Sequence, residues 1–403
     1  MHFSDRIKAL RFSPIRRLIP YSDEVKAQGK KVYHLNIGQP DIKTPEGYFK
    51  AIQNFHPATV AYATSQGIPE LRDAMSAYYH GIGVPYDRND IYVTCGGSEA
   101  LSFAVMILCD AGDEILVPEP FYANYNTFAN CALAKLRPIP TNAENGYHLP
   151  PENVIENLIT SKTRAIWMSH PCNPTGVLYT PDEIGMICRI AKKHDIFIIA
   201  DEVYREFRYN DGEFVSFGSI KDAQDRVIMV DSVSKRYSAC GARIGCIAIK
   251  NKDFLAEAMK LCQGRLSVSS LEQVAATELY KTPKSYLEEV NKEYKMRRDV
   301  LYKGLKAIDG TICHEPEGAF YTMVKFPMLD SSEKFIIWML QNFDINGETT
   351  MAAPGNGFYA NPEQGINEMR IAYVLKKEDL EKALNILKQA IAAYPGRIEA
   401  IKA

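Results

Sequence analysis

Short apolar runs alternate with amphipathic segments between about residues 60 and 285. The runs at 91–94, 114–117, 165–168, 196–200 and 226–230 predict strands. The segment 181–194 begins with a proline and places Ile184, Ile187 and Ala191 on one face, which predicts a helix. Strands that are apolar throughout and separated by helices are typical of a mostly parallel sheet with helices on both faces. We therefore predict an α/β fold.

The pattern changes beyond Pro283. It predicts a long charged helix at 285–308, strands at 318–324 and 369–374, and helices at 333–341 and from about residue 378. These mixed elements indicate a smaller α+β domain. We expect an N-terminal segment, 1–45, that packs with the small domain, a large domain at 46–284 and a small C-terminal domain at 285–403.

Composition and charge exclude several classes of protein. A formal net charge of -2 over 403 residues gives no electrostatic reason to expect nucleic acid or an anionic membrane as partner. The nine cysteines are scattered singly, which argues against a zinc site or a disulfide framework and fits reduced thiols. No run approaches the ~18 apolar residues of a membrane span, and the N-terminus lacks the apolar run of a signal peptide. We expect a soluble cytoplasmic protein.

Polar and small residues gather where the predicted strands of the large sheet end. They are Gly97, Ser98, Asn173, Asp201, Tyr204, Ser232 and Lys235. In open α/β sheets the ligand site lies outside the carboxyl ends of the strands. We therefore expect these residues to converge on one site.

Lys235 stands between hydroxyl side chains and small residues. Ser232 and Ser234 precede it, and Arg243 follows eight residues later. The hydroxyls and the guanidinium suit a phosphate, and desolvation and nearby positive charge disfavour a protonated amine. Such an amine can form a Schiff base with a phosphorylated aldehyde. Taken alone, the segment is also compatible with an ordinary loop between strands.

Other strand-end residues gain a role if that aldehyde is a pyridine. Asp201 could pair with a protonated ring nitrogen, although a helix cap or a salt bridge would also explain it. Tyr204 and Asn173 could reach the ring's phenolic oxygen, or could simply pack and cap a turn. Tyr122 could stack on the ring or belong to the core.

Two further residues suit a substrate carboxylate. The guanidinium of Arg370, at the start of a predicted strand, can bind a carboxylate through two parallel hydrogen bonds, although a surface ion pair is the plainer reading. Gly38 lets the backbone approach the same carboxylate closely.

With these residues in place, the chain resembles the class I pyridoxal-phosphate-dependent aminotransferases of fold type I, of the aspartate aminotransferase type. The segment around Lys235 is similar to the lysine signature of that family. The other landmarks follow in order, from N-I-G-Q-P-D at 36–41 through Tyr62, G-G-S at 96–98, Tyr122, N-P-T-G at 173–176 and D-E-V-Y at 201–204 to M-R-I at 369–371. The resemblance extends from about residue 13 to 390.

The resemblance implies pyridoxal 5'-phosphate as cofactor and a role for each landmark. Lys235 would bind the cofactor and transfer the proton, Asp201 would pair with the ring nitrogen, and Asn173 and Tyr204 would contact the phenolic oxygen. Tyr122 would stack on the ring. The phosphate would be bound by Gly97, Ser98, Ser232, Ser234 and Arg243, with Tyr62 from a second subunit. This sharing implies an obligate homodimer.

The resemblance also implies the reaction. An L-amino acid, aspartate in the first place, and a 2-oxo acid such as 2-oxoglutarate would exchange an amino group by a ping-pong mechanism. Gly38, Asn173 and Arg370 would orient the substrate carboxylate. Arg265, Ser13, Arg16 and Arg17 are candidates for binding the substrate side chain and could equally be surface residues. Aromatic or methionine-type donors, and a carbon–sulfur lyase on the same fold, stay open as alternatives.

Overall fold

The computed structural model describes residues 1–210 and 214–398. Its main sheet has seven strands in the order β2-β8-β7-β6-β5-β3-β4. They are β2 (Ile91–Cys95), β3 (Glu114–Glu119), β4 (Lys135–Pro140), β5 (Thr163–Ser169), β6 (Phe197–Asp201), β7 (Val227–Ser232) and β8 (Ile244–Ala248). Neighbouring strands from β4 to β7 are parallel, whereas β8 is antiparallel to β2 and to β7. The predicted α/β fold with a mostly parallel sheet is confirmed.

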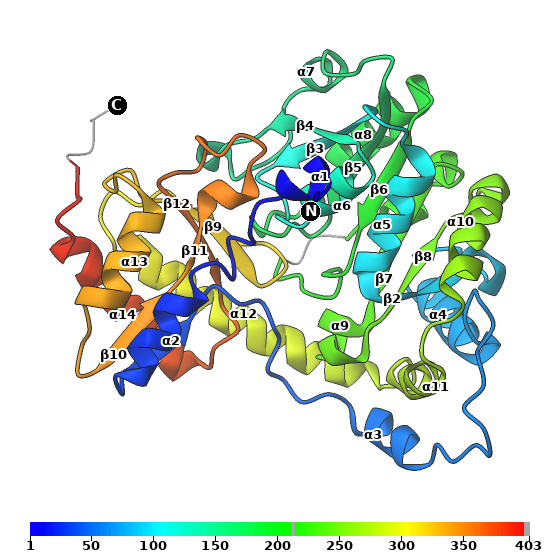
Figure 1. Ribbon diagram of the computed structural model, residues 1–403, viewed down its shortest axis with the longest axis horizontal. Coiled ribbons are helices and arrows are strands. Elements are labelled where there is room, and N and C mark those ends of the chain that lie inside the picture. Colours follow the sequence, from blue (N-terminus) through cyan, green and yellow to red (C-terminus); the bar gives the residue numbers. More distant parts are fainter. Residues whose placement is uncertain (211–213, 399–403) are drawn as a thin grey trace.

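Helices cover both faces of this sheet (Figure 1). They are α3 (Glu46–Gln53), α4 (Pro69–Gly81), α5 (Gly96–Leu108), α6 (Tyr125–Cys131), α7 (Glu152–Glu156), α8 (Pro181–Lys193), α9 (Val233–Arg236), α10 (Lys252–Arg265) and α11 (Ser270–Leu279). Apolar side chains of α5 and α10 pack on one face, and those of α4 and α8 pack on the other. Alternate strand residues serve the two cores, since Trp167 packs with α5 while Ile166 and Met168 pack with α8.

Two small sheets lie beside the main one (Figure 1). The first is antiparallel, in the order β11 (Ala353–Pro354), β12 (Glu368–Ala372) and β9 (Tyr321–Lys325). The second pairs β1 (Lys31–His34) in parallel with β10 (Glu348–Met351). The remaining helices are α1 (Asp5–Lys8), α2 (Ile19–Ala27), α12 (Lys284–Lys306), α13 (Ser332–Asn342) and α14 (Lys377–Ala393). The division at residues 45 and 284 stays a prediction, although β1 and β10 join the N-terminal segment to the C-terminal part.

The structure adds strands that the sequence pattern did not predict. They are β4 and β8 in the main sheet and β1, β10 and β11 in the small sheets. Near the cavity, α6 begins at Tyr125, and the backbone N–H of the preceding Phe121 donates to the carbonyl of Phe358 in the C-terminal part.

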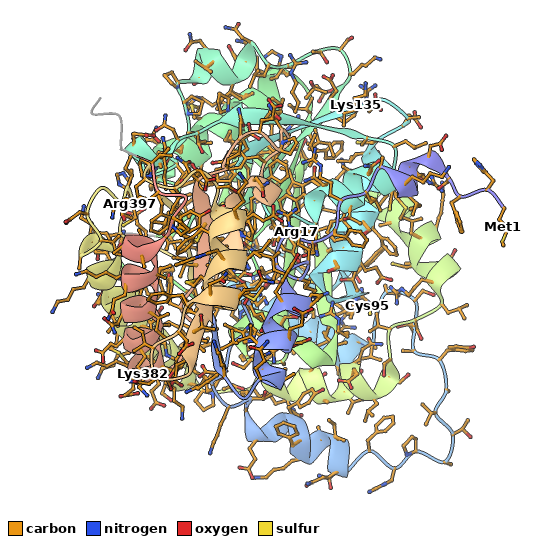
Figure 2. All side chains as sticks on the ribbon, turned by 60° about the vertical axis from the view of Figure 1, so that its left-hand side comes forward. Met1, Arg17, Cys95, Lys135, Lys382 and Arg397 are labelled. Atoms are coloured by element: carbon orange, nitrogen blue, oxygen red, sulfur yellow. The ribbon has the colours of Figure 1, made fainter. Side chains whose placement is uncertain are left out.

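Side chains fill the space between the ribbons (Figure 2). The largest buried cluster joins α12 and α14 to the small antiparallel sheet and to Tyr204 and Phe207 of the large part. No helix within residues 1–210 and 214–398 is long and apolar enough to cross a membrane.

One glycine fixes how closely β8 approaches α5. A Cβ on Gly245 would lie 2.6 Å from the carbonyl carbon of Gly96, 2.7 Å from the nitrogen of Gly97 and 2.8 Å from the oxygen of Asp231. We expect Gly245→Ala to lower the free energy of unfolding by about 1–3 kcal/mol in urea titrations, because backbone must move. Gly241 has open space at the same point, so Gly241→Ala should change stability by less than about 0.5 kcal/mol. Equal effects would contradict this close approach.

Candidate active site

A cavity of about 680 Å³ opens at the carboxyl ends of β5, β6 and β7. Residues of the main sheet and of the small antiparallel sheet line it. Among them are the predicted residues Gly38, Gly97, Ser98, Tyr122, Asn173, Asp201, Tyr204, Ser232, Ser234, Lys235, Arg243 and Arg370. These residues come from seven separate segments of the chain, and the fold brings them to one site.

Lys235 reaches this cavity from the short helix α9. Its Nζ donates to the carbonyl of Gly38 at 2.9 Å and lies 3.8 Å from the Sγ of Cys240. Ser232 caps α9, since its hydroxyl accepts from the N–H of Ser234 at 3.0 Å. Gly38 has no room for a side chain, because a Cβ there would overlap the hydroxyl of Tyr321. The amine is therefore held by a backbone segment that only glycine can form.

Asp201 presents a buried carboxylate at the end of β6. Its Oδ2 accepts from the hydroxyl of Tyr125 at 2.7 Å, whereas Oδ1 is buried and has no hydrogen-bond partner in the described part of the chain. Burial raises the pKa of Asp201 to about 6, and the Tyr125 hydroxyl and the Val203 amide act in the opposite direction. A buried carboxylate oxygen without a donor is costly. A protonated ring nitrogen entering the cavity would supply that donor, so the site fits a pyridinium.

Tyr125 is a functional residue that sequence reasoning missed. It is fully buried, and its ring stacks on Trp167 with centroids 4.0 Å apart. From the sequence it is one of several aromatics near Phe121 and reads as core. Its hydrogen bond to Asp201 could not be inferred, because the two residues are 76 positions apart.

Three polar side chains that line the cavity, Asn173, Tyr204 and Tyr321, are linked by hydrogen bonds. The Nδ2 of Asn173 donates to the Tyr204 hydroxyl at 3.5 Å, and the hydroxyls of Tyr204 and Tyr321 lie 3.1 Å apart. Burial raises the pKa of Tyr204 well above its usual value, so the phenol stays neutral and can donate. Tyr321 was also missed from the sequence, where it reads as an alternating strand residue. Together these groups suit an oxygen anion on a ring.

Arg370 closes the cavity from the small sheet. It is 1% exposed, and it donates to Asn173 Oδ1 at 3.1 Å and to the Asn36 carbonyl at 2.6 Å. Its guanidinium lies over the rings of Tyr321 and Phe358, at 4.4 and 5.0 Å from the centroids. Neither partner carries a charge, so the guanidinium faces the cavity with its charge uncompensated by these contacts. Such a group favours a carboxylate.

An anion site lies at the start of α5. The N-terminal turn of that helix begins with Gly96, Gly97 and Ser98, whose free N–H groups and helix dipole favour negative charge. The guanidinium of Arg243 lies against Gly96 so closely that a Cβ there would overlap it. Arg243 Nη1 is held by the carbonyl of Cys240 at 2.9 Å. This donor set suits a phosphate.

Two predicted residues do not line the cavity. Arg265 donates to the carbonyls of Ser65 at 3.2 Å and Val93 at 3.0 Å, and its Nε lies 3.5 Å from Glu99. Tyr62, between α3 and α4, is 81% exposed. Within a single subunit, neither side chain contributes to the cavity.

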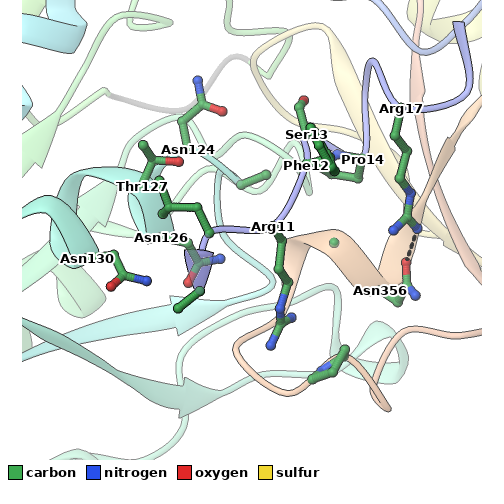
Figure 3. A pocket seen from close by; sticks show the side chains of 15 residues that line it. Arg11, Phe12, Ser13, Pro14, Arg17, Asn124, Asn126, Thr127, Asn130 and Asn356 are labelled. Carbon is green, nitrogen blue, oxygen red and sulfur yellow. Dashed lines mark hydrogen bonds between the residues drawn. The ribbon is translucent and has the colours of Figure 1, made fainter. Parts of the chain in front are cut away.

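The N-terminal candidates line two cavities. Ser13 and Arg16 line the main cavity, and Ser13 also lines a neighbouring cavity of about 190 Å³. Arg17 lines only the neighbouring cavity, where its Nη2 donates to Asn356 at 3.1 Å (Figure 3). The same Nη2 donates to Glu333 at 2.7 Å, so the charge of Arg17 is paired outside the main cavity.

Comparison with known proteins agrees with this geometry. The model of the family described as "Aminotransferase class I and II" matches residues 30–387. An aspartate aminotransferase of Pyrococcus horikoshii is 32% identical over 96% of this chain and 97% of its own length. The solved structure of an alanine aminotransferase from Pyrococcus furiosus has a TM-score of 0.88 at 31% identity, covering 97% of this chain and all (100%) of its own. That of the aspartate aminotransferase from Thermus thermophilus with maleate has a TM-score of 0.86 at 26% identity, with the same coverage.

The buried carboxylate of Asp201 should cost stability when nothing pairs with it. The raised pKa means that the folded protein binds a proton more tightly than the unfolded chain, so this residue's contribution to stability falls as pH rises from about 4 to 6. We expect Asp201→Asn, without bound ligand, to be more stable than wild type by about 1–3 kcal/mol at pH 7.5. Chemical denaturation should show this gain shrinking towards pH 5. A variant that is less stable by the same margin at both pH values would contradict this account.

Proposed function

The chain belongs to the aminotransferase class I and II family, and we propose that it transfers the amino group of aspartate to 2-oxoglutarate in active sites shared by two subunits. It is a pyridoxal-phosphate-dependent aminotransferase of fold type I. Its substrates are an amino acid and a 2-oxo acid.

One observation supports the site assignment above the others. The unpaired Oδ1 of Asp201 and the amine of Lys235 line the same cavity. In the proposed arrangement Asp201 binds the ring nitrogen of the cofactor, and Asn173 and Tyr204 bind its phenolic oxygen. Tyr122 lies against the ring. The phosphate is bound by Gly97, Ser98, Ser232, Ser234 and Arg243.

The bound cofactor supplies an electron sink that makes the α-proton of an amino acid acidic. Lys235 Nζ would accept that proton and carry it as the proton donor for the return step, and the Gly38 carbonyl holds the amine at the cavity wall. Arg370 binds the substrate's α-carboxylate, together with Asn173, and so turns the Cα–H bond towards Lys235. The ionised Asp201 keeps the ring nitrogen protonated, which sustains the sink.

Aspartate is favoured as the donor by the relatives. Their names include aspartate aminotransferases, and one solved structure contains maleate, whose two carboxylates suit a site with two cationic groups. Arg370 would bind one carboxylate. Arg265 of a second subunit, or Arg16 and Ser13 of the same subunit, are predicted to bind the other.

One observation favours a second donor class. Ile15, Ile19, Ile37 and Leu101 also line the cavity, and apolar walls suit aromatic or methionine-type side chains. The similar alanine aminotransferase shows that the same fold is compatible with a small apolar donor. A carbon–sulfur lyase would use the same cofactor site and differ in its products.

The homodimer is likewise a proposal. Tyr62 is 81% exposed, and Val60 and Leu266 near it are 70% and 52% exposed. A second subunit covering these side chains would bring Tyr62 to a neighbouring phosphate site. All nine cysteines are free, which is compatible with the cytoplasm.

Lys235→Ala tests the assignment of the amine. The purified wild type should show a visible absorbance band of the lysine-bound cofactor. The variant should lack this band, because Lys235 is the only lysine among the described residues that lines the cavity. Transamination should fall by about 10⁴-fold or more, since both the covalent link and the proton carrier are lost. Cys240→Ala, a neighbour in the cavity, should keep the band. Normal transamination by Lys235→Ala would contradict the assignment.

A panel of amino donors with 2-oxoglutarate tests the substrate. We expect kcat/KM for aspartate to exceed that for phenylalanine, methionine and alanine by about tenfold or more, the effect of one additional ion pair. A higher kcat/KM for an apolar donor would mean that this donor, and not aspartate, is the preferred substrate. The cofactor assignment would be unaffected. Release of pyruvate and ammonia from cysteine without an oxo acid would indicate the lyase.

A further inference from the structure

The helix that carries Lys235 is too short to be stable alone. α9 contains four residues, Val233–Arg236, and isolated helices of one turn do not form in water. The chain leaves it through Ser238, which has a positive φ of 50°. Contacts with the rest of the protein must therefore fix the position of the lysine.

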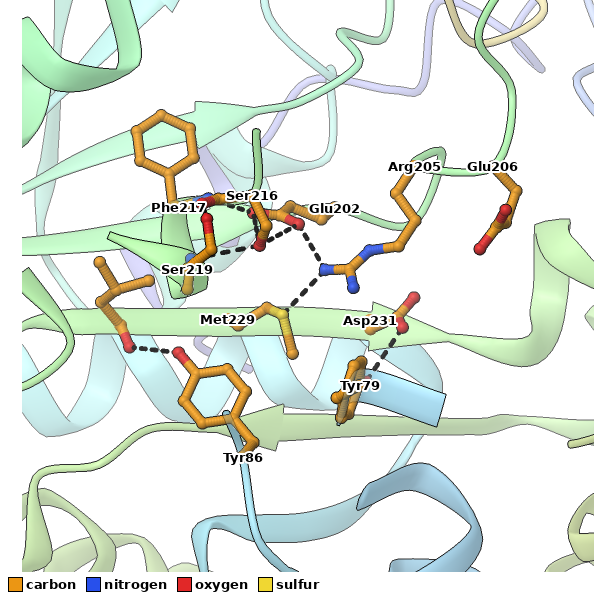
Figure 4. A network of polar contacts seen from close by, with 12 residues as sticks. Tyr79, Tyr86, Glu202, Arg205, Glu206, Ser216, Phe217, Ser219, Met229 and Asp231 are labelled. Atoms are coloured by element: carbon orange, nitrogen blue, oxygen red, sulfur yellow. Dashed lines mark hydrogen bonds and ion pairs between the residues drawn. The ribbon is translucent and has the colours of Figure 1, made fainter. Parts of the chain in front are cut away.

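The strongest of these contacts comes from the neighbouring residue. Nη2 of Arg236 lies 2.6 Å from Oδ2 of Asp231, and both side chains are fully buried (0% exposed). Asp231 is on β7, five residues earlier, and it also accepts from the Tyr79 hydroxyl at 3.0 Å (Figure 4). Its other carboxylate oxygen accepts from the N–H of Ser232 at 2.7 Å. The ion pair thus joins the end of α9 to the strand that leads into it, with Lys235 in between.

Aromatic rings hold the guanidinium in place. The Cζ of Arg236 lies 4.1 Å from the ring centroid of Tyr78 and 5.8 Å from that of Tyr237. Glu206 is 3.8 Å from its Nε, while Nε and Nη1 make no hydrogen bond with described residues. Asp231 is therefore its main polar partner, and a buried ion pair of this kind is costly to break on one side only.

The charge of this ion pair also acts on Asp201. The negative charges of Asp231 and Glu202 both raise the pKa of Asp201. A second buried ion pair, between Glu202 and Arg205, lies just beyond the end of the adjoining strand β6 (Figure 4). Each carboxylate has a guanidinium of its own in direct contact, and the negative charge of Asp231 also raises the pKa of Arg205. Loss of the Arg236 charge would remove the guanidinium in direct contact with Asp231, beside the residues proposed to bind the cofactor.

We propose that Arg236 is a positioning residue for Lys235, which it holds at the cavity through the buried ion pair with Asp231 while balancing the charge of that carboxylate. This inference rests on the proposed role of Lys235. It assigns to Arg236 a part in the reaction, through another residue, in addition to a part in stability.

Variants of the holoenzyme test this role with two readouts. In Arg236→Met we expect kcat to fall about tenfold or more with little change in KM, because the amine is displaced while the substrate site is intact. The pH midpoint of the visible absorbance change of the lysine-bound cofactor should rise by about one unit. The negative charge of Asp231, without its paired guanidinium, favours the protonated, positively charged form of that lysine-bound cofactor. Arg236→Lys keeps the charge and should return the midpoint to within about 0.3 units of wild type.

Arg298→Met is the matched control. Arg298 is also a buried guanidinium with carboxylate partners, Asp299 and Glu315, and it does not line the cavity. This variant should lose stability and keep both the kcat and the absorbance midpoint of wild type. Arg236→Met with the same behaviour as this control would overturn the proposal.

A second variant covers the case in which Arg236→Met does not fold. Asp231→Asn/Arg236→Met removes both buried charges, and with them the cost of an unpaired ion. The proposal expects this folded double variant to have kcat reduced about tenfold or more. A wild-type kcat in the double variant would overturn it. Failure of the proposed function can be told apart from failure of the Arg236 proposal. In the first case the wild type itself would show no cofactor absorbance or no transamination.

Discussion

Burying the carboxylate of Asp201 at the end of β6 costs free energy that nothing within the described chain fully recovers. Tyr125 supplies one hydrogen bond, and the other oxygen has none. The carboxylate is held there because β6 is central in the sheet and ends where β5 and β7 also end. Ser232 ends β7, and Asn173, Tyr204 and Lys235 lie just beyond the ends of β5, β6 and β7, so the same edge gathers the residues proposed to bind the cofactor around the carboxylate. In the proposed complex, the unrecovered cost in the free protein would become binding free energy when a protonated ring nitrogen pairs with the carboxylate.

The small antiparallel sheet completes the cavity from the other side. Arg370 of β12 and Tyr321 of β9 face residues of the large sheet, and Arg370 donates to Asn173 across that boundary. The N-terminal segment adds Gly38, whose carbonyl holds the Lys235 amine. Any relative movement of the two parts would therefore change the distance between the substrate's carboxylate contact and the proton-transferring amine.

Strands β2, β3, β5, β6 and β7 and most of the cavity residues could be predicted from the sequence for a common reason. Uniform apolar runs identify strands buried on both faces, and polar residues that follow the runs mark their carboxyl ends, as Asn173, Asp201 and Ser232 do. The pattern was less informative for the edge strand β4, where charged residues and prolines interrupt the apolar run, and for β8, which directly follows the lysine segment. It also gives no strand direction, so the antiparallel orientation of β8 was not predicted. Tyr125 and Tyr321 were missed because a buried aromatic with a polar partner far along the chain has the same pattern as an ordinary core aromatic. Arg265 was named from resemblance, and its single-subunit contacts place it outside the cavity.

One experiment identifies the amine that binds the cofactor. Reducing the holoenzyme with borohydride fixes the cofactor to its lysine, and peptide mapping by mass spectrometry locates it. If Lys235 is that amine, a single labelled peptide should carry the cofactor on Lys235. A label on another lysine, or a holoenzyme that cannot be labelled, would rule out Lys235.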